Sequence, residues 1–212
     1  MLAGVDEAGR GPVLGPLVVA AVLIESERPM RKLGVKDSKL LSPRKRNELE
    51  PQIRQLAARI ETRIVPAEEL NARMPGENLN VIEAHAFAEL LERLAPTTAI
   101  LDACDVDAER FGRNVAARIT HPTTIKAMHE ADAKHAVVAA ASIIAKVERD
   151  RLMAELRTQH GPCGSGYSHD TATQDWLKTY VATHKKLPPF ARREWETARR
   201  LIPRDHTLLD YS

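Results

Sequence analysis

Short apolar runs alternate along the chain with longer stretches in which apolar residues recur at helical spacing. The segments LAGVDEAGRG and LVVAAVLI are typical of buried strands, and Pro12, Gly15 and Pro16 mark the turn between them. Three later segments, RIETRIVP, TTAILDA and ARITHPTTIKAMH, predict further strands, the last of them with a loop. The pattern therefore predicts five strands.

Helical periodicity occupies most of the remaining chain. Ser42 before Pro43 is an N-cap followed by proline at the first helical position, so we expect a helix over roughly residues 43–57. AEELNARM predicts a short helix, LNVIEAHAFAELLERLA an amphipathic one, and the Ala-rich stretch from Asp132 a single long helix closed by Gly161. WLKTYVATH and REWETARRLI predict basic helices. The order indicates an α/β layer fold with a helical C-terminal addition.

Composition agrees with one globular domain and an appendage. The chain has 212 residues, and 43% of them are hydrophobic, which is enough for a sizeable core. No apolar run approaches the roughly 20 residues that span a bilayer, and the opening MLAGVDEAGR lacks the basic start of a signal peptide. We therefore expect a cytosolic protein without a membrane partner. Cys104 and Cys163 are too few for a disulfide framework or a zinc site.

Charge is unevenly distributed, although the net charge is only +2. Residues 28–59 hold ten Lys or Arg against three acids, residues 66–110 hold ten acids against three basic residues, and residues 176–205 hold eight basic against three acidic residues. Two basic arms around an acidic centre suit a polyanion that is cut over bound cations. Charge alone fits solvated helix faces at least as well.

The glycine-rich segment GRGPVLG does not match a dinucleotide-binding loop. Gly9 and Gly11 fit the first two positions, but Leu14 occupies the third, and a strand follows instead of a helix. The chain also contains no G-x-x-x-x-G-K-[ST] phosphate loop. The sequence therefore gives little evidence for an enzyme that uses a nucleotide cofactor.

Asp6 and Glu7 lie inside the apolar opening strand, where carboxylates are unfavourable unless they are paired or bound to metal. Neighbouring strand residues point to opposite faces, so we expect Asp6 to be the central ligand. Glu7 would contribute at the rim of the site or through its backbone carbonyl. The alternative is an acid pair that caps a neighbouring turn.

Further aspartates follow other predicted elements. Asp102 closes an apolar strand at its C-terminal end, where α/β sheets place ligand sites. Asp105 and Asp107 lack the spacing of a calcium loop, which leaves a solvated or capping turn. Asp132 begins the Ala-rich stretch, and its position alone indicates an N-cap or a partner of the helix dipole.

The motifs VDEAGRGPVLGP, KDSK, LDACDVD, DAK…VVAAASIIAKVERD and GSGY together resemble ribonuclease HII of the archaeal type, over residues 1 to about 200. The resemblance implies a ribonuclease H-like fold: a five-stranded mixed sheet flanked by helices, with a small helical C-terminal domain. It implies a catalytic domain over residues 1–160 and a helical substrate-binding region over residues 161–212. It further implies that the metal-binding carboxylates are Asp6, Glu7, Asp102 and Asp132, which reverses the interpretation of Asp132.

The implied activity is hydrolysis of the RNA strand of RNA/DNA hybrids, with nicking on the 5′ side of ribonucleotides embedded in duplex DNA. Two divalent ions, Mg²⁺ or Mn²⁺, suit such an all-oxygen site, and cleavage would leave 3′-hydroxyl and 5′-phosphate ends. Asp6 would bridge both ions. The alternatives are ribonuclease HIII, another nuclease of the same superfold, and a non-catalytic nucleic-acid binder that uses the basic arms.

Substrate recognition requires a device that senses the 2′-hydroxyl. The resemblance assigns this role to Gly9, Arg10 and Gly11, since glycines let the backbone approach a sugar, and it assigns stacking on the next sugar to Tyr167. The family usually continues from this tyrosine with proline, whereas this chain has Ser168.

Other basic and polar residues are candidates for contact with the duplex backbone. Ser38 and Lys39 match the phosphate-contacting loop of the family, and Ser142 and Lys146 lie one turn apart on the long predicted helix. Non-specific duplex binding, or a solvated surface, would account for the C-terminal cluster of Lys185, Lys186, Arg192 and Arg193. We expect a monomer. The tail HTLLDYS lacks the glutamine and paired aromatics of a sliding-clamp peptide, so no clamp partner is predicted.

Overall fold

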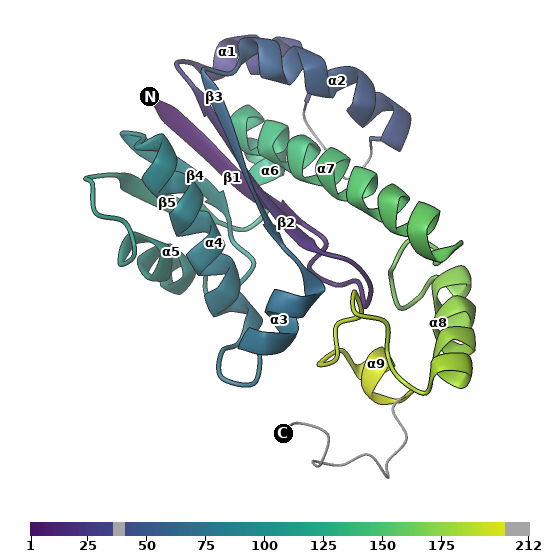
Figure 1. Cartoon of the computed structure of the whole chain (residues 1–212). Helices are drawn as coiled ribbons and strands as arrows, with labels where there is room; N and C mark the ends of the chain where they lie inside the picture. Colours follow the sequence, from purple (N-terminus) through teal and green to yellow (C-terminus); the bar gives the residue numbers. More distant parts are fainter. Residues whose placement is uncertain (36–40, 202–212) are drawn as a thin grey trace.

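The computed structural model describes residues 1–35 and 41–201 and is built around one sheet (Figure 1). The strand order is β3-β2-β1-β4-β5. The strands are β1 (Leu2–Ala8), β2 (Leu17–Ile24), β3 (Arg59–Val65), β4 (Thr98–Asp102) and β5 (Thr124–Met128). β2 pairs antiparallel with β1 and β3, whereas β4 pairs parallel with β1 and β5. The five-stranded mixed sheet is therefore confirmed.

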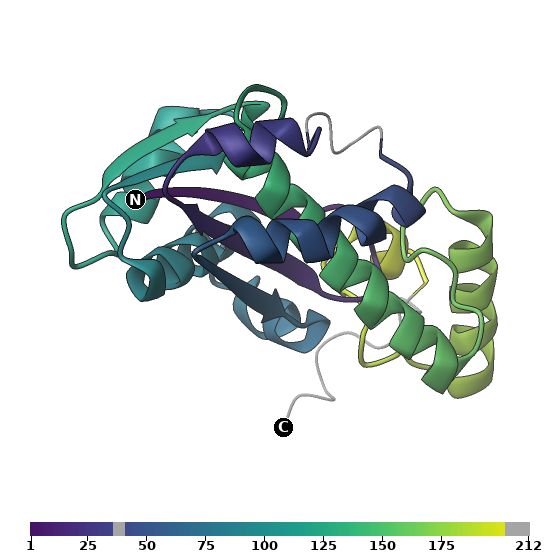
Figure 2. The ribbon, with the colours of Figure 1, turned by 90° about the horizontal axis from the view of Figure 1, so that it is seen from above.

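Helices cover both faces of the sheet, as Figures 1 and 2 show. They are α1 (Glu27–Lys32), α2 (Pro43–Leu56), α3 (Ala67–Arg73), α4 (Leu79–Leu94), α5 (Ala108–Ala116), α6 (Ala131–Lys134), α7 (Ala136–His160), α8 (Thr171–His184) and α9 (Glu196–Arg199). One apolar cluster joins α4 and α5 to the sheet, and a second joins α1, α2 and α7 to its other face. β2 is buried on both faces, which explains its uninterrupted apolar sequence.

Two expected helices differ from their predictions. The long helix expected from Asp132 is divided into α6 and α7, because His135 between them has an extended backbone (φ −121°, ψ 118°). Glu27 on α1 accepts a hydrogen bond from the Val137 N–H group at 3.2 Å and so stabilises a new helix start. In REWETARRLI only α9 is helical within the described residues. The Ser42 cap is confirmed, since its hydroxyl accepts the Lys45 N–H at 3.2 Å.

The helices α1 and α5 were not anticipated from the sequence. Asp107 forms the N-cap of α5 and accepts the Arg110 N–H at 2.9 Å, which confirms its interpretation as a capping residue. Asp105 is not solvated, because it is only 4% exposed and forms an ion pair with Arg110.

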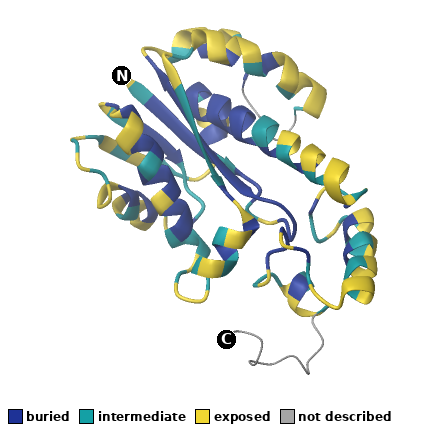
Figure 3. Cartoon of the chain, viewed as in Figure 1, coloured by how far each residue is buried: buried dark blue, intermediate teal, exposed yellow. Residues whose placement is uncertain are grey.

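Residues 161–201 pack against the end of α7 and the loop that follows β1. A third apolar cluster joins them, and its buried members are Val13, Leu14, Met153, Cys163, Leu177, Phe190, Ala191 and Ala198. Figure 3 shows the buried central strands and the exposed outer face of α8. A boundary between two domains at residue 160 stays a prediction. Among the described helices, none combines the length and the apolar character that crossing a membrane requires.

Candidate active site

Three aspartates from different elements meet at one end of the sheet. Asp6 lies on β1, Asp102 ends the neighbouring parallel strand β4, and Asp132 lies on α6. The β1–β4 register pairs Val5 with Leu101, which brings the following Asp6 and Asp102 side by side. One carboxylate oxygen from each of the three residues lies within 4.8 Å of the others. This arrangement is a candidate cation site.

Hydrogen bonds orient two of these carboxylates. The Ser142 hydroxyl on α7 bonds to Asp6, and the Glu7 N–H donates to Asp6 Oδ1 at 2.7 Å. The Ala131 N–H donates to Asp102 Oδ1 at 3.0 Å, which ties the end of β4 to the start of α6. The site is therefore built into the sheet and the adjacent helices.

Burial and mutual repulsion disfavour the charged forms of Asp6 and Glu7. Asp6 is 4% exposed, and its pKa is raised well above the ordinary value by burial first and then by the charges of Glu7 and Asp102. The pKa of Glu7 is raised to about 7 by burial and by Asp102. A bound divalent cation would reverse this preference, and carboxylate oxygens are the donors that Mg²⁺ and Mn²⁺ prefer. The residues present therefore fit such an ion.

Glu7 lies between the aspartates and a neighbouring pocket. The residue is partly buried, and its Oε2 has no hydrogen-bond partner among the described residues. Glu7 lies outside the three-carboxylate group but lines the pocket. This position agrees with the expectation that Asp6 is central and Glu7 peripheral, although the role of each stays a prediction.

The pocket has a volume of about 370 Å³ and brings together most of the expected substrate residues. It is lined by Glu7, Ala8, Gly9, Arg10, Gly11, Arg46, Lys146, Arg149, Asp150 and Tyr167. Lys146 donates to the Ser142 hydroxyl at 2.9 Å and so connects the pocket to the aspartates. Ser142 itself is 1% exposed and lies against Asp6. A nucleic-acid strand in this pocket would therefore lie beside the candidate cation site.

Position 9, in the wall of the pocket, requires glycine for its backbone conformation and for lack of space. Its φ is +86°, and a Cβ at this position would lie 2.3 Å from Arg149 Nε. The side chain of Arg10 bonds to Glu83 and Asn80 on α4. Ser38 and Lys39 lie outside the described residues.

Several residues that hold the pocket were missed by the sequence analysis. Arg192 was expected on the surface but is fully buried, so its assignment to duplex binding is wrong, whereas Lys185, Lys186 and Arg193 are exposed. Arg149 and Glu83 are buried too. Their sequence contexts, VERDR and NVIEAH, carry no local signal of burial.

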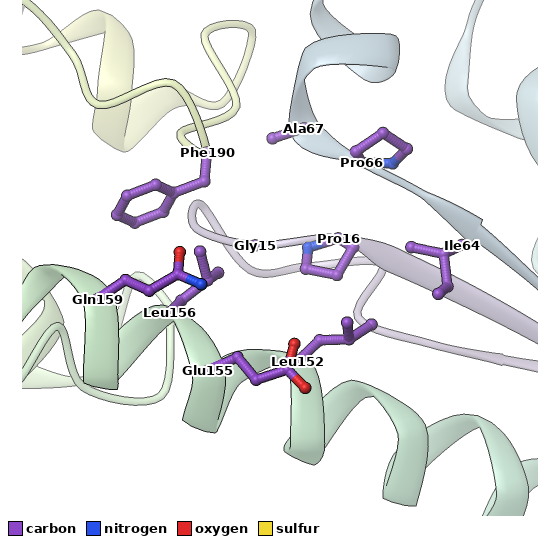
Figure 4. Close-up of a pocket in the computed structure, with 10 residues that line it drawn as sticks. All are labelled: Gly15, Pro16, Ile64, Pro66, Ala67, Leu152, Glu155, Leu156, Gln159 and Phe190. Atoms are coloured by element: carbon purple, nitrogen blue, oxygen red, sulfur yellow. The ribbon is translucent and has the colours of Figure 1, made fainter.

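A second hollow of about 240 Å³ lies between α7 and the Gly15–Pro16 turn (Figure 4). Its lining is apolar apart from Glu155 and Gln159, with Leu152, Leu156 and Phe190 around it. It offers no cation and no cluster of carboxylates, so we place the active site at the pocket beside the aspartates.

Comparison with known proteins gives one family. The ribonuclease HII family model matches residues 3–198. The ribonuclease HII of Methanocella arvoryzae is 45% identical over 203 residues, which cover 94% of this chain and 90% of that protein.

Solved structures agree with the sequence relatives. The ribonuclease H2 of Pyrococcus horikoshii superposes with a TM-score of 0.89 at 41% identity, covering 94% of this chain and 96% of that chain. The PCNA:RNase HII complex from Archaeoglobus fulgidus gives 0.87 at 43% identity, covering 96% and 97%. A ribonuclease HIII structure, at 21% identity, shares the fold with a TM-score of 0.78 and covers 94% and 68%. By sequence and by fold over nearly its whole length, this chain belongs to the ribonuclease HII family and is a ribonuclease H enzyme.

Proposed function

We propose that this chain nicks duplex DNA on the 5′ side of an embedded ribonucleotide and also cuts the RNA strand of longer RNA/DNA hybrids, leaving 3′-hydroxyl and 5′-phosphate ends. The observation that carries the proposal is the convergence of Asp6, Asp102 and Asp132 beside the pocket that Gly9, Gly11 and Tyr167 help to line. Membership of the ribonuclease HII family supports it.

The proposed cofactor is a pair of divalent ions, Mg²⁺ or Mn²⁺, held by Asp6, Asp102 and Asp132 with Glu7 at the rim. When bound, such ions lower the pKa of water and stabilise negative charge on a phosphodiester. The protein prepares this site through the Ser142 hydroxyl on Asp6 and the Ala131 N–H on Asp102. These bonds orient the carboxylate oxygens before any ion binds.

Recognition of the ribonucleotide is proposed for the backbone of residues 9–11 and for Tyr167. The Arg10 side chain is engaged by α4, so the backbone is the part of this loop that is open to a 2′-hydroxyl. Lys146 lines the same pocket and supplies a positive charge for a phosphate.

The proposed partners are RNA/DNA hybrid and ribonucleotide-containing duplex DNA, with residues 161–212 as a substrate-binding region. Exposed Lys185, Lys186 and Arg193 support non-specific contact with a duplex. The Archaeoglobus fulgidus relative has been solved as a complex with PCNA. The tail HTLLDYS lies outside the described residues, so the expectation that this chain lacks a clamp partner stays a prediction, which a PCNA pull-down would test.

The test of the function uses a DNA duplex with one ribonucleotide and the matched all-DNA duplex. With Mg²⁺ we expect a single nick on the 5′ side of the ribonucleotide, no cut in the all-DNA duplex, and no product in EDTA. Cleavage of both duplexes would indicate a general nuclease of the same superfold. Binding without cleavage in Mg²⁺ and in Mn²⁺ would contradict the proposal.

A further inference from the structure

A buried arginine from the C-terminal segment lies behind the loop that lines the pocket. The Arg192 side chain is fully buried, and its Nε donates to the Gly15 carbonyl oxygen at 2.9 Å. Its two terminal nitrogens donate to the carbonyl oxygens of Arg10 at 3.1 Å and Gly9 at 2.6 Å. One side chain thus holds both ends of the turn that follows β1.

Trp195 binds the next carbonyl oxygen of the same loop. Its ring centroid lies 4.8 Å from Arg192 Cζ, and its Nε1 donates to the Gly11 carbonyl oxygen at 3.1 Å. Three consecutive carbonyls therefore bond to the C-terminal segment. Within the described residues, no acceptor receives the N–H of Arg10 or Gly11, so these donors are available to a ligand.

Backbone pairing connects the same two segments. The Gly15 N–H donates to the Phe190 carbonyl at 2.9 Å, and the Arg192 N–H donates to the Val13 carbonyl at 2.8 Å. Leu14 and Ala191 form an antiparallel bridge between these bonds. Figure 4 shows Phe190 facing the Gly15–Pro16 turn. The segment around Arg192 therefore packs behind the loop that follows β1, and main-chain hydrogen bonds hold the two segments in register.

Arg149 on α7 makes a similar connection to Tyr167. Its Nη2 lies 3.4 Å from the carbonyl oxygens of Leu14 and Ser165, and its guanidinium lies 5.2 Å from the Tyr167 ring centroid. The N–H groups of residues 13 and 14 both donate to the Gly166 carbonyl, at 2.8 and 3.1 Å. These bonds connect the loop that carries Tyr167 to the loop that follows β1, so the two loops are fixed relative to each other.

The two arginines form no salt bridge with a carboxylate of the described part of the chain. Burial, together with the charge of Arg149, lowers the pKa of Arg192 to about 9. Burying two neighbouring cations without a carboxylate partner contributes little to stability. Their fork geometry, by contrast, is well suited to holding several carbonyl oxygens in fixed directions.

We infer that Arg192, assisted by Arg149, is a positioning residue for RNA-versus-DNA discrimination, which it sets by holding the carbonyls of Gly9 and Arg10 away from the pocket and the N–H groups of Arg10 and Gly11 toward it. The C-terminal segment then contributes to specificity as well as to duplex affinity. This inference rests on the proposed function. It assigns to Arg192 no contact with the substrate.

The experiment compares Arg192→Lys, which keeps the charge but loses the fork, with Arg113→Lys on α5, an exposed arginine remote from the pocket. Trp195→Phe is a milder second variant that keeps a ring and loses only the bond to Gly11. For each protein we would measure the single-turnover nicking rate at saturating enzyme with Mg²⁺. Affinities for the ribonucleotide-containing duplex and for the all-DNA duplex would be measured in Ca²⁺, and melting temperatures by circular dichroism.

For Arg192→Lys we expect the single-turnover rate to fall by roughly tenfold or more, because a small misplacement of recognition groups has large kinetic effects. The preference for the ribonucleotide duplex should shrink, while affinity for the all-DNA duplex stays unchanged. Trp195→Phe should shift both quantities in the same direction by less, and Arg113→Lys should match the wild type. If Arg192→Lys does not fold, Trp195→Phe decides the question alone.

Three results would overturn the inference. Parallel loss of affinity for both duplexes would make Arg192 a contributor to non-specific binding. A lower melting temperature with unchanged rate and preference would make it a purely structural residue, and wild-type behaviour in every assay would leave it no role. If the wild-type chain itself fails to nick the ribonucleotide duplex, the proposed function fails and the inference fails with it.

Discussion

The guanidinium of Arg10 donates to the carboxylate of Glu83, which is fully buried on α4. A second nitrogen of Arg10 donates to Asn80 Oδ1 at 2.6 Å. The partners differ in access to water, since the Arg10 side chain is 35% exposed and that of Glu83 is 0% exposed. α4 therefore anchors the pocket loop through this ion pair. If the pair were broken, Arg10 would be hydrated but Glu83 would not.

This asymmetry predicts unequal effects on stability. Arg10→Ala strands a buried carboxylate and should lower the free energy of unfolding by about 3 kcal/mol. Glu83→Gln leaves an arginine that reaches water and keeps one amide oxygen as acceptor, so the loss should be about 1 kcal/mol. Guanidinium denaturation measures both. The double variant Arg10→Ala/Glu83→Leu should recover part of the Arg10→Ala loss, and equal losses in the two single variants would contradict this account.

The aspartate cluster predicts a separation of activity from stability. We expect the nicking rate to fall by roughly 100-fold or more in each of the variants Asp6→Asn, Asp102→Asn and Asp132→Asn. Loss of a metal ligand should cost at least as much as loss of a residue that only hydrogen-bonds to a ligand. In the metal-free protein Asp6→Asn should not destabilise the fold, because it removes the repulsion that Glu7 and Asp102 exert on the buried Asp6 carboxylate. The nicking assay in Mg²⁺ and melting in EDTA check the two parts.

Asp107→Asn is the matched control for these variants. Asp107 caps α5, and asparagine caps a helix N-terminus about as well as aspartate. This variant should keep both the activity and the Mg²⁺-induced rise in melting temperature. A cluster variant that behaves like Asp107→Asn would not be a metal ligand.

Local patterns predicted the frame of this molecule well. LVVAAVLI became β2 with the same bounds, and the strand-end position of Asp102 placed it beside Asp6 through the parallel pairing of β1 and β4. Such features depend on neighbouring residues and on strand geometry. They can therefore be predicted from the sequence.

The residues that were missed depend on contacts between distant segments. The Arg192 side chain bonds to the Gly9 carbonyl 183 positions earlier in the chain, and nothing in PPFARREW distinguishes it from the exposed Arg193. Asp132 was assigned to the site only through the family resemblance, because its local position indicated a helix cap, whereas its side chain lies with Asp6 and Asp102. Periodicity describes which residues are apolar, but it does not identify a buried charge whose partners are remote.

The raised pKa values predict that the metal-free protein is less stable at neutral and alkaline pH than at acidic pH. The pKa of Glu7 in the folded protein is about 7, above its ordinary value of 4.5, so the folded state binds protons more tightly than the unfolded state. The resulting stabilisation is fully present below pH 4.5 and is lost as the pH rises through about 7. Asp6 acts in the same direction.

Urea denaturation in EDTA between pH 5 and 8 tests this dependence. The free energy of unfolding should fall across this range by more in the wild type than in Glu7→Gln, which carries no titrating group at this position. Addition of Mg²⁺ at pH 8 should restore stability, because the cation favours the ionised carboxylates. Identical pH slopes for the two proteins would show that Glu7 titrates normally.

Gly11 offers a test of the pocket that leaves the fold intact. A Cβ at Gly11 would meet no atom within 4 Å, whereas a Cβ at Gly9 would meet Arg149 Nε at 2.3 Å on a backbone with φ +86°. Gly11→Ala should therefore change the free energy of unfolding by less than about 0.5 kcal/mol, and Gly9→Ala should be clearly destabilised. The new methyl group of Gly11→Ala would nevertheless stand in the pocket where a sugar must approach the backbone.

Nicking by Gly11→Ala should fall by at least about tenfold at saturating enzyme. Affinity for the all-DNA duplex should not change, because the exposed C-terminal basic residues are untouched. Wild-type nicking by a stable Gly11→Ala protein would mean that the sugar does not approach this loop. Discrimination between RNA and DNA would then have to come from another part of the pocket wall, where Tyr167 is the remaining candidate for contact with the sugar.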